Sequence, residues 1–137
     1  MFDAMQISAS GLTAESLRLD VIANNLANAD TTQTPQGGPY RSEFVVFSSI
    51  PAPSSGPNAN IGQGVEVSAI LPDQSPFQVV YDPTNPQANA QGNVLYPNVN
   101  LATQMVDMVE ASQAYQANSS AFTASKDTVL QALNLGG

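Results

Sequence analysis

The sequence predicts a mainly α-helical fold with a small β insert. Long helices at the two ends of the chain are expected to pack as a coiled-coil-like pair, with a short-stranded, β-rich middle module between them. One observation is a seven-residue apolar repeat near the start, and another is a matching repeat in the last third. Such a repeat marks the side of a helix that packs lengthwise on another helix. In contrast, residues 31–97 are rich in proline, glycine and short β-branched or aromatic runs.

The N-terminal repeat predicts a helix over residues 1–30. Its apolar positions recur every seven residues, with one further residue on the same side: Met5, Leu12, Leu19, Leu26 and Ile22. Asp3 is placed to cap the start of this helix, and Asn28 marks its exit. Gly11 lies in mid-helix among small residues, where glycine costs about 1 kcal/mol relative to alanine. We therefore expect another helix to come very close at this point.

The C-terminal repeat predicts a helix from about residue 101 to residue 133. Its first row of apolar residues again has a spacing of seven: Leu101, Met108, Tyr115, Phe122 and Val129. Met105 and Leu133 are expected to form a second row on the same side. Asn100 is a suitable N-cap residue for this helix. The terminal helical domain is thus predicted to comprise residues 1–30 and 98–137, with residues 31–97 as the middle module.

Four short segments of the middle module predict strands. They cover residues 40–48, 65–71, 77–81 and 93–96, where β-branched and aromatic residues gather or alternate with polar ones. The stretches between them, rich in proline and glycine, predict loops. This module has too few apolar residues for a large core.

The charge and composition exclude several classes of protein. The net charge is −8 with only three basic residues, so no basic patch for nucleic acid exists. The chain has no cysteine or histidine, which excludes disulfides, a cysteine nucleophile and a histidine base. No apolar run is long enough to span a membrane. The acidic start MFDAMQIS lacks the basic region of a secretory signal. Any exit from the cytoplasm is therefore expected to use a route that reads no cleaved signal.

The low content of charged residues favours an assembly subunit. Only 10 % of residues are charged, whereas about a quarter is usual. Neutral amides and small hydroxyl groups can be buried against neighbours without the desolvation cost of charge. An isolated pair of helices would also leave half of each apolar repeat in water, so the ends are expected to become stable only among copies or partners. The alternative is a soluble monomer with a weakly charged surface.

Segments at both ends of the chain resemble the signatures of a known family. Ser10-Gly11-Leu12 and the run RLDVIANNLANADT from Arg18 to Thr31 resemble the N-terminal signature of bacterial flagellar rod and hook proteins. The segments PNVN at 97–100 and SQAYQAN at 112–118 resemble their C-terminal signature. The family-motif positions singled out are Asn24, Asn25, Asn28, Gln116 and Asn118.

The middle of the chain is similar to one branch of these proteins, the proximal-rod C type, or FlgC family. The similarity lies in PYR at 39–41, VVF at 45–47, YDP at 81–83 and ANAQG at 88–92, and in the short length. Gln104 and Gln113 stand where the wider family often has Glu and Arg, so an inter-subunit ion pair cannot be carried over to these positions.

The resemblance implies a structural role. It implies a subunit that assembles helically, through its terminal helices, into the periplasmic rod of the flagellar basal body. That rod transmits torque and surrounds the export channel. The implied partners are copies of the chain, other rod proteins and the flagellar type III export apparatus, with no membrane insertion. The apolar residues of both helical repeats are the candidate assembly interface.

No residues are predicted to carry catalysis, and no cofactor or metal is expected. Asp107 and Glu110 are spaced three residues apart on a helix, which favours a solvated or interfacial edge over a catalytic pair in a cleft. Three alternatives to the rod subunit remain from the sequence. They are a secreted coiled-coil adaptor, another axial subunit of the hook or distal rod, and a small hydrolase that uses acidic residues.

Overall fold

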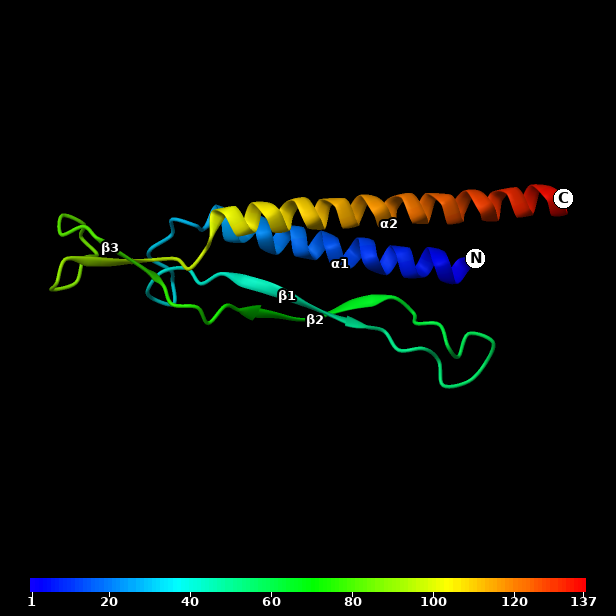
Figure 1. Ribbon diagram of the computed structural model, residues 1–137, viewed down its shortest axis with the longest axis horizontal. Helices are drawn as coiled ribbons and strands as arrows, with labels where there is room; N and C mark the ends of the chain where they lie inside the picture. The colour runs from blue at the N-terminus through cyan, green and yellow to red at the C-terminus, as the bar shows by residue number, and fades with distance from the viewer.

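The computed structural model describes residues 1–137, which form two long helices and four short strands. In chain order these are α1 (Phe2–Ala27), β1 (Glu43–Ser49), β2 (Val65–Pro72), β3 (Gln78–Tyr81), β4 (Asn93–Tyr96) and α2 (Leu101–Gly136). The molecule is elongated, and α1 and α2 lie side by side in opposite directions (Figure 1). The expected fold class, mainly α-helical with a small β insert, is therefore confirmed.

The helix ends are set partly by local capping. Asn100 caps α2 as predicted, because its side-chain oxygen accepts a hydrogen bond from the Thr103 amide at 3.0 Å. α1 ends at Ala27 with Asn28 as its C-cap residue, so the predicted exit at Asn28 is confirmed. The expected cap at Asp3 is wrong: α1 starts at Phe2 without a side-chain cap, and the Asp3 carboxylate accepts a hydrogen bond from Asn58, 2.7 Å away in the β1–β2 loop. None of the helices has the length and apolarity needed to cross a membrane.

The strands form two separate hairpins. β1 pairs antiparallel with β2, with one irregularity between Val46 and Phe47, and β3 pairs antiparallel with β4. The β1–β2 hairpin lies along α1, on the side away from α2, and β3–β4 projects beyond the end of the helix pair (Figure 1). α1 is consequently the central layer of the molecule.

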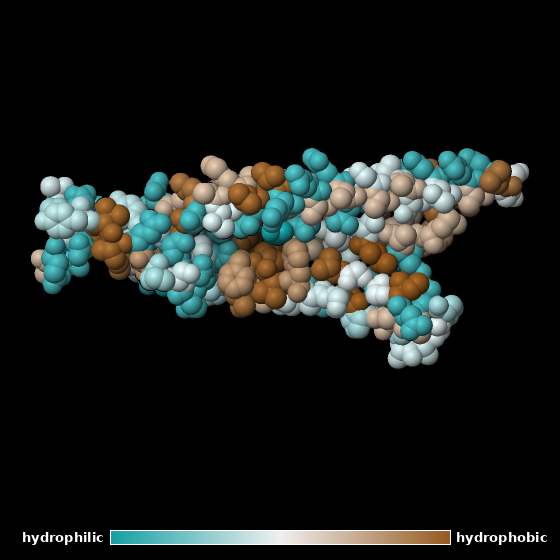
Figure 2. Space-filling model, in the orientation of Figure 1, coloured by the Kyte–Doolittle hydropathy of each residue, from teal (hydrophilic) through white to brown (hydrophobic).

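Little of the chain is buried. Only 12 of 137 residues are buried, and six of them are apolar: Ala14, Val21, Ile22, Val94, Val99 and Ala111. The accessible surface is 8704 Å², whereas a compact monomer of 14.3 kDa exposes about 6,800 Å². Apolar side chains gather on the surface over β1–β2, on the first half of α2 and near β3–β4 (Figure 2). A chain of this shape leaves an unusual amount of apolar surface in water.

Candidate assembly interface

Three pairs of residues define how α1 and α2 lie against each other. A Cβ atom added to Gly11 would lie 2.7 Å from the side-chain carbon of Asn118, so the helices are in close contact there. The predicted close approach of a helix at Gly11 is thus confirmed. About two turns further along α1, Arg18 reaches Glu110, and about two turns beyond that Asn25 reaches Gln104.

The same register leaves α2 without a partner at its end. Since Gly11 lies level with Asn118 and Asn25 with Gln104, Met1 lies level with a residue near 128. About eight residues of α2 therefore extend past the start of α1, as the two termini show in Figure 1. Leu130, Leu133 and Leu135 are all exposed on this extension.

The side of α2 that faces α1 carries small and polar residues. Gln104, Ala111 and Asn118 face α1, and Ala111 is fully buried. The predicted second row does not lie between α1 and α2, because Met105 and Leu133 are 58 % and 66 % exposed. Met105 follows Gln104 by one residue and so points about 100° away from α1, and Leu133 lies on the extension of α2 that α1 does not reach. Met105 and Leu133 face solvent in the single chain.

The other predicted interface residues fall into two groups. On α1, Ile22 is buried, and four residues are half-buried: Met5, Leu12, Leu19 and Leu26. On α2, three are half-buried, namely Met108, Phe122 and Val129, whereas Leu101 and Tyr115 are exposed. The half-buried residues contribute to the fold of the single chain, and the exposed ones are free to contact another chain.

Asn25 joins α1, β1 and α2. It is 1 % exposed, and all four of its side-chain hydrogen bonds are made. Its amide nitrogen donates to the Glu43 carbonyl at 2.7 Å and to Gln104 Oε1 at 3.0 Å. Its oxygen accepts from the Tyr40 hydroxyl at 2.8 Å and from the Glu43 amide at 3.0 Å. A fully satisfied buried amide of this kind fixes one register among its neighbours.

Tyr40 belongs to the same junction. Burial, together with the negative charge of Glu43, raises the pKa of the Tyr40 hydroxyl above its ordinary value, although a hydrogen bond from Asn24 opposes the shift. The phenol therefore stays protonated at neutral pH and can donate to Asn25.

The other family-motif residues have more modest roles. Asn28 donates to the Asn24 carbonyl at 3.0 Å at the end of α1, and Asn118 donates to the Ala114 carbonyl at 3.0 Å within α2. Asn24 and Gln116 are exposed. The Asn28 hydrogen bond holds the end of α1, and the Asn118 hydrogen bond holds the side chain that lies against Gly11.

A second junction holds the segment between β2 and β3. Arg41 and Asn98 both donate hydrogen bonds to the carbonyl oxygens of Asp73 and Ser75, at 2.7–3.1 Å. The Arg41 guanidinium also stacks over the ring of Phe77, 4.2 Å from its centroid. Hydrogen bonds from the Ser75 hydroxyl and amide lower the pKa of the Asp73 carboxyl below its ordinary value, with a smaller contribution from the Arg41 charge.

This junction was not predicted as a site from the sequence. The signal was present only as the motif PNVN, in which Asn98 stands two residues before the α2 cap. Its partners lie more than twenty residues away along the chain, so spacing alone could not pair them.

Arg18 is shared by three carboxylates at the α1–α2 contact. Its guanidinium nitrogens lie 3.5 Å from Glu110, 3.7 Å from Glu15 and 4.0 Å from Asp107. Glu15 Oε2 is buried without a hydrogen bond, so the single cation does not satisfy all three carboxylates. The cluster leaves excess negative charge at the edge of α2.

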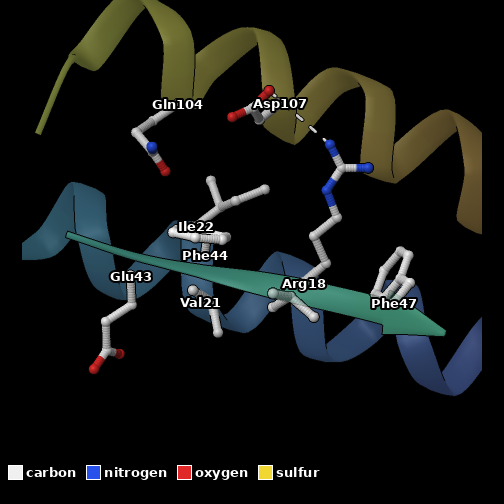
Figure 3. Close-up of a pocket in the computed structure, with 9 residues that line it drawn as sticks. Arg18, Val21, Ile22, Glu43, Phe44, Phe47, Gln104 and Asp107 are labelled. Atoms are coloured by element: carbon white, nitrogen blue, oxygen red, sulfur yellow. Dashed lines mark ion pairs between the residues drawn. The ribbon is translucent and has the colours of Figure 1, made fainter. Parts of the chain in front are cut away.

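Beside this cluster is an open cleft of about 220 Å³ between α1, β1 and α2. Figure 3 shows Ile22, Val21 and Phe44 on its apolar side and Arg18 with Asp107 at its edge. The cleft contains no nucleophile and base pair.

Comparison with known proteins gives matches at both ends and over the full length. Residues 5–33 match the family described as "Flagella basal body rod protein", and residues 90–135 match "Flagellar basal body rod FlgEFG protein C-terminal". The chain is similar to proteins named "Flagellar basal-body rod protein FlgC" from several bacteria. It is 43 % identical to that of Borreliella burgdorferi, over 97 % of this chain and 95 % of the relative.

Two further relatives, from other bacteria, show the same similarity. The chain is 43 % identical to the FlgC of Bacillus subtilis, over 98 % of this chain and 97 % of the relative. It is 40 % identical to the FlgC of Salmonella typhimurium, over 99 % of this chain and 98 % of the relative. Because these matches cover nearly the whole of each chain, and because the exposed helix faces fit a protein that packs among others, the chain belongs to the FlgC family of flagellar basal-body rod proteins.

Proposed function

We propose that this chain, a structural protein rather than an enzyme, is built into the proximal rod through the uncovered faces of its terminal helices. The observation that supports this most is the surface area. The chain exposes about 1,900 Å² more than a compact protein of its mass should. That excess is similar to the total area buried in a typical stable protein–protein interface.

The exposed residues of α2 are the main candidates for this contact. Leu101, Met105, Val106 and Val109 are each more than half exposed, and they lie within three turns of α2. On a soluble monomer such a cluster is an aggregation risk, whereas in an assembly it is a contact surface. The predicted assembly residues that face solvent, including Tyr115 and Leu133, belong to the same proposal.

In the assembled state the helix pairs would stack helically, as coiled-coil-like units, into a shaft that transmits torque around the export channel. The partners would be copies of this chain and other rod proteins. The subunit would leave the cytoplasm through the flagellar type III export apparatus without a cleaved signal and would lie in the periplasmic part of the basal body. Support for these statements comes from family membership and from the exposed helix faces.

The test uses the bacterium that encodes this chain, with its own gene deleted. A tagged wild-type copy should restore swimming and should be found in purified basal bodies. The variant Met105→Asp, Val109→Asp should restore neither, because two charges would be buried at the contact. Thr103→Asp, an exposed polar position about 160° and 120° around the helix axis from Met105 and Val109, serves as the control and should behave as wild type. Normal assembly of the double variant would refute the role of this face, and absence of the wild-type chain from basal bodies would refute the function.

Assembly should also be visible in the helices themselves. Circular dichroism of the purified chain should show less helix than α1 and α2 contain when assembled, because the ends gain most of their burial from neighbours. Equal helicity in the free and assembled forms would show instead that the helix pair is stable alone.

A further inference from the structure

The cleft between α1, β1 and α2 has an apolar floor that the single chain leaves open. Phe44 and Phe47 line it beside Val21 and Ile22, yet they are 47 % and 36 % exposed. Leu71 pairs with Phe44 across the two strands, is 44 % exposed and extends the apolar surface onto β2. Figure 2 shows apolar side chains gathered over this hairpin. More than a third of the surface of each of these three side chains is therefore in contact with water.

The cleft is large enough to receive one long side chain. Its volume is about 220 Å³, whereas an apolar cavity of about 150 Å³ already holds a benzene molecule. The size alone fits an aliphatic, an aromatic or a long basic side chain. The charges at the edge of the cleft decide among these three.

Negative charge prevails around the cleft. Glu43 and Asp107 line it, and Figure 3 shows Arg18 with Asp107 at its edge. Glu110, one turn after Asp107, has a side chain that is 63 % exposed, and Arg18 is shared among Glu15, Asp107 and Glu110. Four carboxylates thus lie in or beside the cleft with a single cation. The edge carries negative charge that the chain itself does not balance.

A basic side chain from a neighbour matches both features. The long stems of Lys and Arg cover apolar surface while their charged ends reach carboxylates, and an Arg guanidinium also stacks on a Phe ring. An acidic side chain would be repelled by the edge, and a purely apolar one would leave its charge unmatched. The cleft is therefore complementary to an apolar segment that includes a Lys or an Arg.

This chain is poorly equipped to supply that side chain from a second copy. Arg18 is engaged by carboxylates, and Arg41 is held by two carbonyl groups and the Phe77 ring. Lys126 is exposed and makes no ion pair, but Asp127 follows it directly. Each copy also carries a net charge of −8. A second copy would therefore bring more negative than positive charge to the cleft.

We propose that the cleft and Leu71 bind a protein other than this chain. An apolar segment of that protein covers Phe44 and Leu71, and its Lys or Arg reaches Asp107 and Glu110. This contact is centred on the β1–β2 hairpin and is separate from the exposed face of α2 at Met105. The inference rests on the proposed function as a rod subunit with other proteins as neighbours, and it adds the chemistry of one such neighbour.

Photo-cross-linking tests which chain covers the hairpin. In the strain that lacks its own gene, p-benzoylphenylalanine replaces Leu71, and purified basal bodies are irradiated. We expect an adduct with a different protein, mapped to an apolar segment within about four residues, or about one helical turn, of a Lys or Arg. The same photo-reactive residue at Ser54, an exposed position in the distant β1–β2 loop, is the control and should give no adduct with that peptide.

The role of charge is tested in the same cross-linking background. Asp107→Asn, Glu110→Gln should lower the yield of the adduct about two- to fivefold, the effect of losing an exposed ion pair. Glu15 still pairs with Arg18 in this variant, so the α1–α2 contact keeps an ion pair.

The matched control removes the same charge outside the cleft. Asp20→Asn, Asp127→Asn changes two exposed carboxylates that do not line it, and the yield should equal that of the unmodified background. Equal yields from the two double variants would refute the charge pairing.

The mapped basic residue of the partner completes a double-mutant cycle. Its replacement by Gln should lower the yield by a similar factor. Combined with Asp107→Asn, Glu110→Gln, it should cause little further loss, because both changes remove the same pair. Losses that multiply independently would show that the two sides do not meet, and would overturn the proposal.

The remaining outcomes separate this inference from the proposed function. An adduct between two copies of this chain would assign the cleft to a second copy and refute the inference. A Leu71 variant that is present in basal bodies but forms no adduct would refute it too, while the chain would remain a rod subunit. Absence of the wild-type chain from basal bodies would refute the function itself.

A second readout covers the case in which only the Leu71 variant fails to enter basal bodies. The two double charge variants are then compared without the photo-reactive residue. Asp107→Asn, Glu110→Gln should be incorporated less than Asp20→Asn, Asp127→Asn, and equal incorporation would refute the charge pairing.

Discussion

Replacing Asn25 with aspartate should unfold the junction between α1, β1 and α2 at neutral pH. The change exchanges the amide nitrogen for an oxygen while conserving size. That nitrogen now donates to the Glu43 carbonyl at 2.7 Å, so the new oxygen would face a carbonyl oxygen at hydrogen-bond distance. Gln104 can turn its own amide to donate instead, but a backbone carbonyl cannot.

The expected cost follows from these contacts. One buried acceptor loses its donor, at about 1–3 kcal/mol, and a carboxylate replaces a neutral amide at a position that is 1 % exposed. Together these effects should destabilise the chain by about 3–5 kcal/mol at pH 7, a large part of the stability of a small domain. Burial raises the pKa of the introduced carboxyl, so the loss should shrink toward pH 4, where the protonated acid can again donate to Glu43.

The assay is urea unfolding followed by circular dichroism at 222 nm, at pH 7 and pH 4. Asn24→Asp is the matched control, because it makes the same chemical change at the preceding, exposed position and should cost less than about 1 kcal/mol. The reasoning is refuted if Asn25→Asp unfolds at the same urea concentration as wild type, or if both variants lose equal stability.

Three further substitutions test other contacts, each by thermal unfolding of the purified chain. Gly11→Ala should destabilise the chain by about 1–2 kcal/mol despite the better helix propensity of alanine, because the new Cβ would meet Asn118. Adding Asn118→Ala should restore most of this loss, whereas a stabilised Gly11→Ala variant would contradict the close helix contact. Gly64→Ala should destabilise the chain by about 2–3 kcal/mol, because Gly64 has a φ of +111° and the alanine Cβ would overlap the Ser10 hydroxyl. That hydroxyl accepts a hydrogen bond from the Val65 amide and holds the β1–β2 hairpin to α1, so unchanged stability would argue against this anchor. Tyr40→Phe should cost about 1 kcal/mol at pH 8, because the phenol is protonated and donates to Asn25 there. Since the pKa of Tyr40 is raised in the folded chain, the difference from wild type should shrink as the pH rises above 10; a difference independent of pH would exclude this hydrogen bond.

The sequence predicted the helices well because their signals are local. The seven-residue repeats and the Asn100 cap each involve residues within a turn or two of one another, and the structure places α2 at Leu101–Gly136. Gly11, a mid-helix glycine among small residues, also correctly predicted that a second helix comes very close at this point.

The errors concern contacts between distant parts of the chain. Asp3 was expected to cap α1, but its carboxylate is taken by Asn58, 55 residues further on. Met105 was expected to lie on the same side of α2 as the first apolar row, although Gln104, one residue earlier, is the residue that meets Asn25. Polar residues such as Asn25 and Asn98 organise this fold, and a search for apolar rows could not weigh them as interior residues.

The unequal lengths of the two helices set a condition on growth. α2 overruns α1 by about eight residues, or about 12 Å, so the subunit ends in a ledge rather than a blunt face. The opposite end of the molecule carries the β3–β4 hairpin and has no matching ledge. A tube assembled from such subunits has two different ends, and an incoming subunit contacts a different surface at each end. The unequal helix lengths of a single subunit therefore give any such assembly a polarity.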